Sequence, residues 1–222
     1  MKAIRTLAVC LLAAFSANLS AQVRAASNCV AHPEDEIGLS YGYFTMPHSI
    51  ILLGGALGTG LSLGAARMSK CVSTGALTVE YMHYIHPHVA FGALLGFEDV
   101  IMAFDKYAGK DGGGNAIYEP GKPGHTIVIS PMGGAKFPWF YKSHFSMYSK
   151  FAAGLMLMHQ TGAEYSEKGS EETQKSESNT SVNVAFQVNP VCLDFGGGRF
   201  RGFAEFGYGN QGICTAGVRW IF

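Results

Sequence analysis

The sequence predicts an all-β protein, an eight-stranded antiparallel up-and-down β-barrel that crosses a membrane with its strands. Three observations lead to this prediction. The chain is 48% hydrophobic and only 14% charged, whereas soluble domains carry about 25% charged residues. Its apolar residues alternate with small or polar ones over many short segments, which is the period of a β-strand. Long and short connections between these segments follow one another, as in transmembrane barrels.

The first segment, residues 1–21, has the three parts of a secretory signal peptide. Two basic residues precede an apolar run from Leu7 to Phe15, and small residues follow. This run is too short to span a bilayer. We expect cleavage after Ala21, with Ala25 as the alternative, and residues 22–35 then form a periplasmic segment ahead of the barrel.

The barrel is expected to occupy residues 36–222. Its first strand shows the pattern clearly, because Leu39 and Tyr41 share one face while Gly38 and Ser40 lie on the other. This period of two residues distinguishes strands from helices. The same alternation predicts strands at 36–44, 75–83, 88–98, 124–137, 144–159, 181–195, 200–208 and 213–222.

The two faces of these strands indicate what surrounds the barrel. One face is a continuous aromatic and aliphatic stripe, and the other carries glycine, small residues and isolated charges. This arrangement fits lipid outside and a narrow polar lumen, and a soluble ligand-binding barrel would need the reverse. Charges in a narrow lumen must be compensated, so we expect a network of Glu80, Glu98, Lys136, Lys150, Arg201, Glu205 and Arg219.

The connections predict the orientation of the barrel. Three connections at one end of the predicted strands are short, at 86–88, 138–143 and 196–199. Those at the opposite end are long, at 45–73, 106–123 and 160–180, except for the short connection at 209–212. Outer-membrane barrels have short periplasmic turns and long external loops. An even number of strands then places both termini in the periplasm, and the chain is expected to be an integral protein of the cell outer membrane.

Some segments do not follow the simple pattern. Residues 49–66, in the first long loop, are too apolar for an ordinary external loop. We interpret them as a short apolar segment that could be helical, in preference to a ninth and a tenth strand, although five glycines weaken a helix. Pro131 and Pro190 fall inside predicted strands, where proline cannot donate a ladder hydrogen bond, so local bulges are expected there.

The sequence contains few residues that indicate disulfides, metals or cofactors. Four cysteines of the exported chain, Cys29, Cys71, Cys192 and Cys214, allow three pairings. The predicted topology leaves Cys71–Cys214 as the reachable pair. The sequence has no metal-ligand spacing and no cofactor motif, so we expect neither a bound metal nor a cofactor. The formal net charge of zero gives no indication of a nucleic-acid partner.

The C-terminal "TAGVRWIF" resembles the signal that the outer-membrane barrel-assembly machinery reads, with Thr215, Gly217, Trp220 and Phe222 at the matching positions. More broadly, residues 36–222 are similar to small bacterial outer-membrane β-barrel domains of the OmpA/OmpX type. The stretches "KFPWFYKSHFSMYSKFAAG" and "FRGFAEFGYGNQGICTAGVRWIF" carry this resemblance. It implies that the partners are the assembly machinery and periplasmic chaperones during biogenesis, and outer-membrane lipid or lipopolysaccharide afterwards.

The expected function is non-enzymatic, either structural or surface-binding, with external loops that contact a partner the sequence does not identify. The alternative is a lipid A-modifying enzyme, a deacylase or acyltransferase, because some eight-stranded barrels use a histidine and a serine that face the outer leaflet. His125 and His159, with Ser130 or Ser166, are the candidates for such a site. His144 and Ser146 belong to the periplasmic turn, on the wrong side of the membrane. The oligomeric state stays open.

Overall fold

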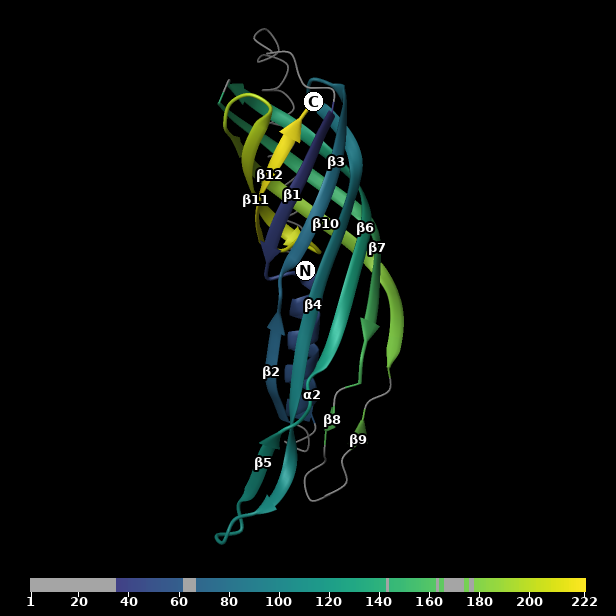
Figure 1. The fold of residues 1–222 in the computed structure, drawn as a ribbon, viewed down its shortest axis with the longest axis vertical. Coiled ribbons are helices and arrows are strands. Elements are labelled where there is room, and N and C mark those ends of the chain that lie inside the picture. The colour runs from purple at the N-terminus through teal and green to yellow at the C-terminus, as the bar shows by residue number, and fades with distance from the viewer. Residues whose placement is uncertain (1–34, 62–66, 143, 163, 166–173, 176–177) are drawn as a thin grey trace, which may run out of the picture.

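Eight strands form the barrel in the computed structural model, which describes residues 35–61, 67–142, 144–162, 164–165, 174–175 and 178–222 (Figure 1). These strands are β1 (Asp35–Tyr43), β3 (Ala76–His86), β4 (Val89–Lys110), β6 (Gly124–Lys142), β7 (Phe145–Gln160), β10 (Asn179–Phe195), β11 (Phe200–Gly209) and β12 (Cys214–Ile221). The remaining elements are α2 (Met46–Leu61), β2 (Arg67–Ser73), β5 (Ala116–Pro120), β8 (Glu164–Tyr165) and β9 (Gln174–Lys175).

The eight strands close into a ring. Each pairs antiparallel with the next in chain order, β1-β3-β4-β6-β7-β10-β11-β12, and β12 pairs back with β1 over the register Glu36↔Ile221 to Tyr43↔Cys214. The predicted all-β, eight-stranded up-and-down barrel is therefore confirmed. We call the end with the β3–β4, β6–β7 and β10–β11 connections the turn end, and the opposite end the wall end.

Two strands are longer than the sequence predicts. The alternation predicts a strand at 88–98, but β4 continues to Lys110 because β2 and β5 pair with its outer half. Strand β6 runs through most of the predicted turn at 138–143, and a register shift between Pro138 and Phe140 accommodates the proline. The alternation of apolar and polar residues does not reveal such extensions. A bulge shifts the pattern by one residue, and a strand with both faces in water has no apolar face to show.

The first long connection contains both a helix and a strand. Helix α2 confirms the helical segment, and the hydroxyl of Thr45 caps it by accepting a hydrogen bond from the backbone N–H of His48 at 3.2 Å. Strand β2 was not predicted, and it pairs with the part of β4 beyond the barrel. Among the described residues, no helix has the length and apolarity needed to cross a membrane.

The two prolines behave differently. A register shift between Val188 and Val191 confirms the bulge at Pro190. The bulge expected at Pro131 is wrong, since the pairing of β6 with β7 resumes at Met132↔Gly154 without a change of register. Gly154 explains the difference, because a Cβ there would lie 2.1 Å from the carbonyl oxygen of Pro131, so the glycine lets the two backbones approach.

No disulfide joins the cysteines of the described residues. Cys71, Cys192 and Cys214 are free thiols, and Cys29 lies outside the described residues. Cys71 and Cys214, the pair that the predicted topology left as reachable, are not neighbours, because β4, β3 and β1 lie between β2 and β12 in the sheet. Neighbouring strands are about 4.8 Å apart, so these two Cα atoms exceed the roughly 7 Å limit of a disulfide.

Candidate functional site

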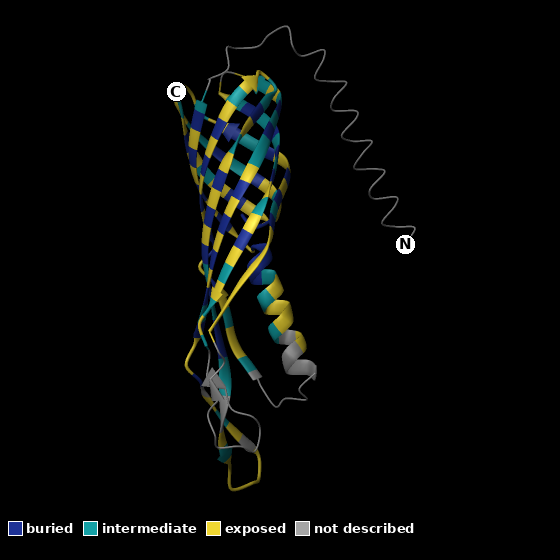
Figure 2. Ribbon diagram, turned by 90° about the vertical axis from the view of Figure 1, so that its right-hand side faces the viewer, coloured by how far each residue is buried: buried dark blue, intermediate teal, exposed yellow. Residues whose placement is uncertain are grey.

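The barrel is apolar outside and polar inside. Exposed and buried residues alternate along the barrel strands where they form the closed ring, which gives the chequered ribbon of Figure 2. On the outer face Phe91 is 50% exposed and Leu155 54%, whereas the inward-facing Glu80 is 2% exposed and Lys150 0%. A soluble barrel would show the opposite distribution, so this is a barrel that crosses a lipid bilayer, in which the closed ring also leaves no strand edge unpaired in the hydrocarbon.

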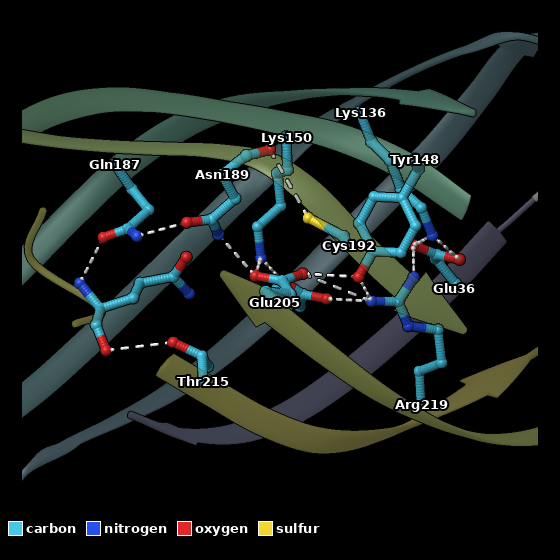
Figure 3. A network of polar contacts seen from close by, with 12 residues as sticks. Glu36, Lys136, Tyr148, Lys150, Gln187, Asn189, Cys192, Glu205, Thr215 and Arg219 are labelled. Atoms are coloured by element: carbon cyan, nitrogen blue, oxygen red, sulfur yellow. Dashed lines mark hydrogen bonds and ion pairs between the residues drawn. The ribbon is translucent and has the colours of Figure 1, made fainter. Parts of the chain in front are cut away.

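Buried charged side chains fill the lumen near the turn end (Figure 3). They come from seven of the eight barrel strands and are held within a few ångströms of one another by ion pairs and hydrogen bonds. We name these side chains, with the uncharged Tyr148 that hydrogen-bonds to two of them, the ionic layer; its members are Glu36, Glu80, Lys136, Tyr148, Lys150, Asp194, Glu205 and Arg219.

Arg219 lies at the centre of the ionic layer. One terminal nitrogen lies 3.2 Å from Glu36 and 3.3 Å from Asp194. The other lies 3.2 Å from Glu80 and donates a hydrogen bond to the hydroxyl of Tyr148 at 2.7 Å. The planar fork of a guanidinium allows one cation to serve several acceptors in this way.

Two lysines supply the remaining positive charges, so three cations face four carboxylates in the ionic layer. Each lysine ammonium bridges two carboxylates; the N–O distances are 2.8 Å (Lys136–Glu36), 3.6 Å (Lys136–Asp194), 2.7 Å (Lys150–Glu80) and 2.5 Å (Lys150–Glu205). Aromatic rings flank the cations, with the Arg219 guanidinium carbon 4.1 Å from the ring centroid of Phe203. An eight-stranded barrel is just wide enough for its side chains to fill, so the layer occupies the lumen and leaves no path for a solute through it.

The charges predicted from the sequence do not all meet. The structure brings Glu80, Lys136, Lys150, Glu205 and Arg219 together in the ionic layer. Glu98 lies apart at the wall end, and the buried Nε of Arg201 has no hydrogen-bond partner among the described residues.

Sequence reasoning missed Glu36, Asp194 and Tyr148. Glu36 shares its face with the small residues of β1, so the alternation of this strand predicts that its side chain faces the lumen. An unbroken alternation along β10 places Asp194 on the outer face. The predicted bulge at Pro190 reverses this: Gln187 and Asn189 face inward before it, and Cys192 and Asp194 face inward after it.

An uncharged cluster fills the lumen beside the ionic layer. Its buried side chains come from α2 and from the inner faces of β3, β4, β6, β7 and β10. We name it the methionine cluster; its members are Met46, Met82, Ala90, Leu94, Val128, Met132, Ala152, Met156 and Ala185. Methionines pack against small residues here, and their flexible thioethers suit an irregular space of this kind.

Two connections close the lumen at the wall end. The β11–β12 loop turns inward, where the Asn210 amide donates to the hydroxyl of Ser130 at 3.1 Å. The first turn of α2 covers the rest, because the hydroxyl of Thr45 donates to the Glu98 carboxylate at 2.6 Å and Ser73 donates to the same oxygen. The buried carboxylate of Glu98 thus lies beside a helix N-terminus, which favours negative charge. Phe44, which leads into this helix, has a positive φ of 58°.

The residues of the predicted assembly signal lie on both faces of β12. Thr215 is buried and donates a hydrogen bond to the backbone carbonyl of Gln211, and Gly217 leaves room for the backbone of β1. Trp220 and Phe222 are 46% and 58% exposed. Their recognition by an assembly machinery stays a prediction.

The histidines considered for catalysis have other partners. The His125 ring nitrogen lies 3.0 Å from Asp99, and that of His159 lies 2.9 Å from the Thr180 hydroxyl. Ser130 faces the lumen, on the other side of β6 from His125, so it cannot serve as the nucleophile. Ser166 lies outside the described residues. Ser146, at the turn end, donates to Asp194 at 3.3 Å.

Four neighbouring strands extend beyond the rest of the barrel. β4, β6, β7 and β10 have 22, 19, 16 and 17 residues, whereas β1, β3, β11 and β12 have 9, 11, 10 and 8. Their outer parts, with α2, β2 and β5, form a projection that we call the wall (Figure 1). At its tip the Asp111 carboxylate accepts hydrogen bonds from the side chain and backbone of Asn115, and these lower the pKa of Asp111.

No protein-family model and no curated protein matches this chain. Among solved structures it is similar to Ail, the attachment invasion locus protein of Yersinia pestis, in complex with the heparin analogue sucrose octasulfate, at 15% identity and a TM-score of 0.36 over 85% of this chain and 95% of Ail. Ail alone gives 14% and 0.35 over the same shares. The translocator domain of autotransporter NalP from Neisseria meningitidis gives 10% and 0.36 over 97% of both chains. The barrel architecture follows from the strand pairing of this chain itself. These similarities add no conclusion to it.

Proposed function

We propose that this chain is an integral protein of the outer membrane that acts without catalysis and presents the wall for contact with other molecules. The observation that carries this proposal is the length difference between the two halves of the barrel, with the long strands of 16 to 22 residues all on one side. The ionic layer leaves no solute path, and the described residues hold no group of three metal-ligating side chains. Loops and extensions on a rigid scaffold are the usual carriers of binding function.

The turn end faces the periplasm in this proposal. Asp35 and Phe222 exchange backbone hydrogen bonds at 3.3 and 3.0 Å, so the start of the first strand and the residue after the last strand lie side by side at the turn end, away from the wall. The exposed belt would contact outer-membrane lipid, including lipopolysaccharide. The barrel-assembly machinery and periplasmic chaperones would receive the chain through Thr215, Gly217, Trp220 and Phe222, and a Phe222→Ala variant should then give less heat-modifiable barrel.

The test of the proposed function is a variant in which residues 103–119 are replaced by a short turn, which shortens the wall and leaves the barrel ring intact. Cells with this variant should lose the contacts of wild-type cells, such as attachment to other cells or to host surfaces, while the barrel stays heat-modifiable. Equal attachment in both strains would contradict the proposal.

Lipid A mass spectrometry tests the enzymatic alternative. Cells with and without the gene should give the same lipid A masses. A difference of one acyl chain that disappears in a His125→Ala/His159→Ala variant would establish the lipid A-modifying activity instead.

A further inference from the structure

The turn end carries a rim of exposed basic side chains beside the lipid-facing belt. They lie on β3, at the end of β6, and in the β6–β7 and β10–β11 connections. We name this set the basic rim; its members are His83, His86, Lys142, His144 and Arg199. Because successive strand pairs of the ring supply these residues, the basic side chains are distributed around the barrel instead of gathering on one side of it.

The two permanent cations of the basic rim each adjoin a residue of the apolar belt. Lys142 shares the outer face of β6 with Phe140, and its ammonium nitrogen lies 5.7 Å from the centroid of the Phe140 ring. Arg199 directly precedes Phe200, which is 57% exposed. A long basic side chain beside an apolar residue in hydrocarbon can extend its charge to the headgroup level. The basic rim is therefore continuous with the surface that contacts lipid.

The acidic side chains of this end do not cancel the basic rim. The carboxylates of the ionic layer face the lumen, where they pair with buried cations. Outside the lumen, Asp35 is the acidic side chain that the described residues place at the turn end. Its carboxylate accepts a hydrogen bond from the Tyr81 hydroxyl and lies 2.9 Å from the His83 ring nitrogen, so its charge is already engaged.

The opposite rim of the belt, at the wall end, has a different composition. There the outward-facing Asp99 lies 3.0 Å from the ring nitrogen of His125, and the ring nitrogen of His159 lies 2.9 Å from the Thr180 hydroxyl. A carboxylate and hydrogen-bonded imidazoles stand where the turn end has lysine and arginine. As far as the described residues define the two rims, the turn end is the one that matches an anionic surface.

We propose that the basic rim binds the phosphate groups of anionic phospholipids in the leaflet next to the turn end. The lysine ammonium and the arginine guanidinium would pair with phosphate, and the imidazoles would add hydrogen bonds to it. Two observations identify this occupant. The positive charge of the rim complements phosphate, and the rim borders the belt that hydrocarbon surrounds, so lipid headgroups lie at its level. The inference requires a barrel in a bilayer and is independent of the role proposed for the wall.

The preference of the barrel for anionic lipid can be measured with spin-labelled lipids. The full-length protein is refolded into phosphatidylcholine vesicles, and electron paramagnetic resonance gives the association of labelled phosphatidylglycerol with the barrel relative to that of labelled phosphatidylcholine. Lys142→Gln/Arg199→Gln removes the two permanent cations. Lys70→Gln/Lys110→Gln is the matched control, because it removes two exposed lysines from β2 and β4 on the wall. Heat-modifiability shows that each variant is folded.

We expect the wild-type protein to prefer phosphatidylglycerol about fivefold or more, since one cation near a membrane surface contributes about this factor. The preference should fall as salt is added, because exposed charges are screened. Lys142→Gln/Arg199→Gln should abolish the preference, while the wall variant keeps the wild-type value. Excess glycerol phosphate in the buffer, at matched ionic strength, should leave the preference unchanged, which distinguishes a headgroup in the bilayer from a free phosphate.

Three results would overturn the inference. The first is equal association of the two lipids with the wild-type protein, and the second is an undiminished preference in Lys142→Gln/Arg199→Gln. The third is loss of the preference in glycerol phosphate, which would make the basic rim a site for soluble anions. The proposed function is tested separately, by cell attachment with the shortened wall, and would survive all three results.

Discussion

The ionic layer and the methionine cluster fill the same lumen by opposite means. In the ionic layer every side chain has a defined partner, and Arg219 alone contacts five other members. In the methionine cluster the contacts are apolar, apart from a hydrogen bond that the Asn210 amide donates to the Met156 sulfur at 3.1 Å. Met82 and Met156 are 0% and 2% exposed, and no member of the cluster is charged. The difference suggests that the ionic layer fixes the register of the strands, whereas the cluster fills whatever space that register leaves.

This comparison predicts different responses to mutation. Removing one partner from the ionic layer leaves other charges buried and unpaired, which is costly. Removing volume from the cluster leaves a cavity that flexible neighbours can partly refill. Stability in each case can be measured by urea unfolding of the refolded barrel in micelles.

The largest effect is expected from Arg219→Met. It keeps most of the volume but leaves four carboxylates with two lysines, so unfolding should become easier by about 3–5 kcal/mol. Arg219→Lys, which keeps the charge but not the fork, should lose less. A methionine variant as stable as wild type would show that the layer does not hold the barrel together.

A smaller effect is expected from Met156→Ala in the methionine cluster. We expect a loss of about 2 kcal/mol, at the low end for a buried methionine, because the neighbouring methionines can move into the space. Met156→Leu conserves volume and should cost less than about 1.5 kcal/mol. If the alanine variant lost as much stability as Arg219→Met, the methionine cluster would contribute as much as the ionic layer to fixing the register of the strands.

Thr45→Val tests the junction between the lumen and α2. The hydroxyl of Thr45 both caps the helix and donates to Glu98, so its loss should cost about 1 kcal/mol. The effect should be local, with faster amide exchange in α2 and unchanged exchange in the barrel strands. Uniformly faster exchange would mean that the first turn of α2 stabilises the whole barrel.

The smallest effect concerns an exposed carboxylate, as a contrast to the buried ones. In Asn115→Ala the pKa of Asp111 should rise towards its usual value, as followed by NMR titration, because the side-chain hydrogen bond is lost. A lowered pKa stabilises the turn above the usual carboxyl pKa and loses that contribution as the pH falls through the folded value. At this exposed site the stability of the barrel should not change measurably.

The sequence was sufficient for the barrel strands because each has one apolar and one polar face, and this alternation is visible wherever lipid and lumen oppose each other. It was insufficient where that contrast ends. Strand β2 lies beyond the ring, and Asp194 follows a bulge that reverses the parity of β10. The bulge expected at Pro131 is absent because Gly154, on another strand, accommodates the proline, which is a long-range effect that no local pattern contains.

The contact between Arg219 and Glu36 joins residues 183 positions apart, on the last and the first strands of the barrel. Until β12 pairs with its neighbours, the four carboxylates of the ionic layer lack Arg219, which forms an ion pair with each of them. An unclosed sheet would therefore hold carboxylates without their shared ion-pair partner next to lipid, and partly inserted forms should be too unstable to accumulate. Membrane insertion and ring closure should accordingly occur as one cooperative step, and the barrel would enter the bilayer only when Arg219 has paired with these carboxylates.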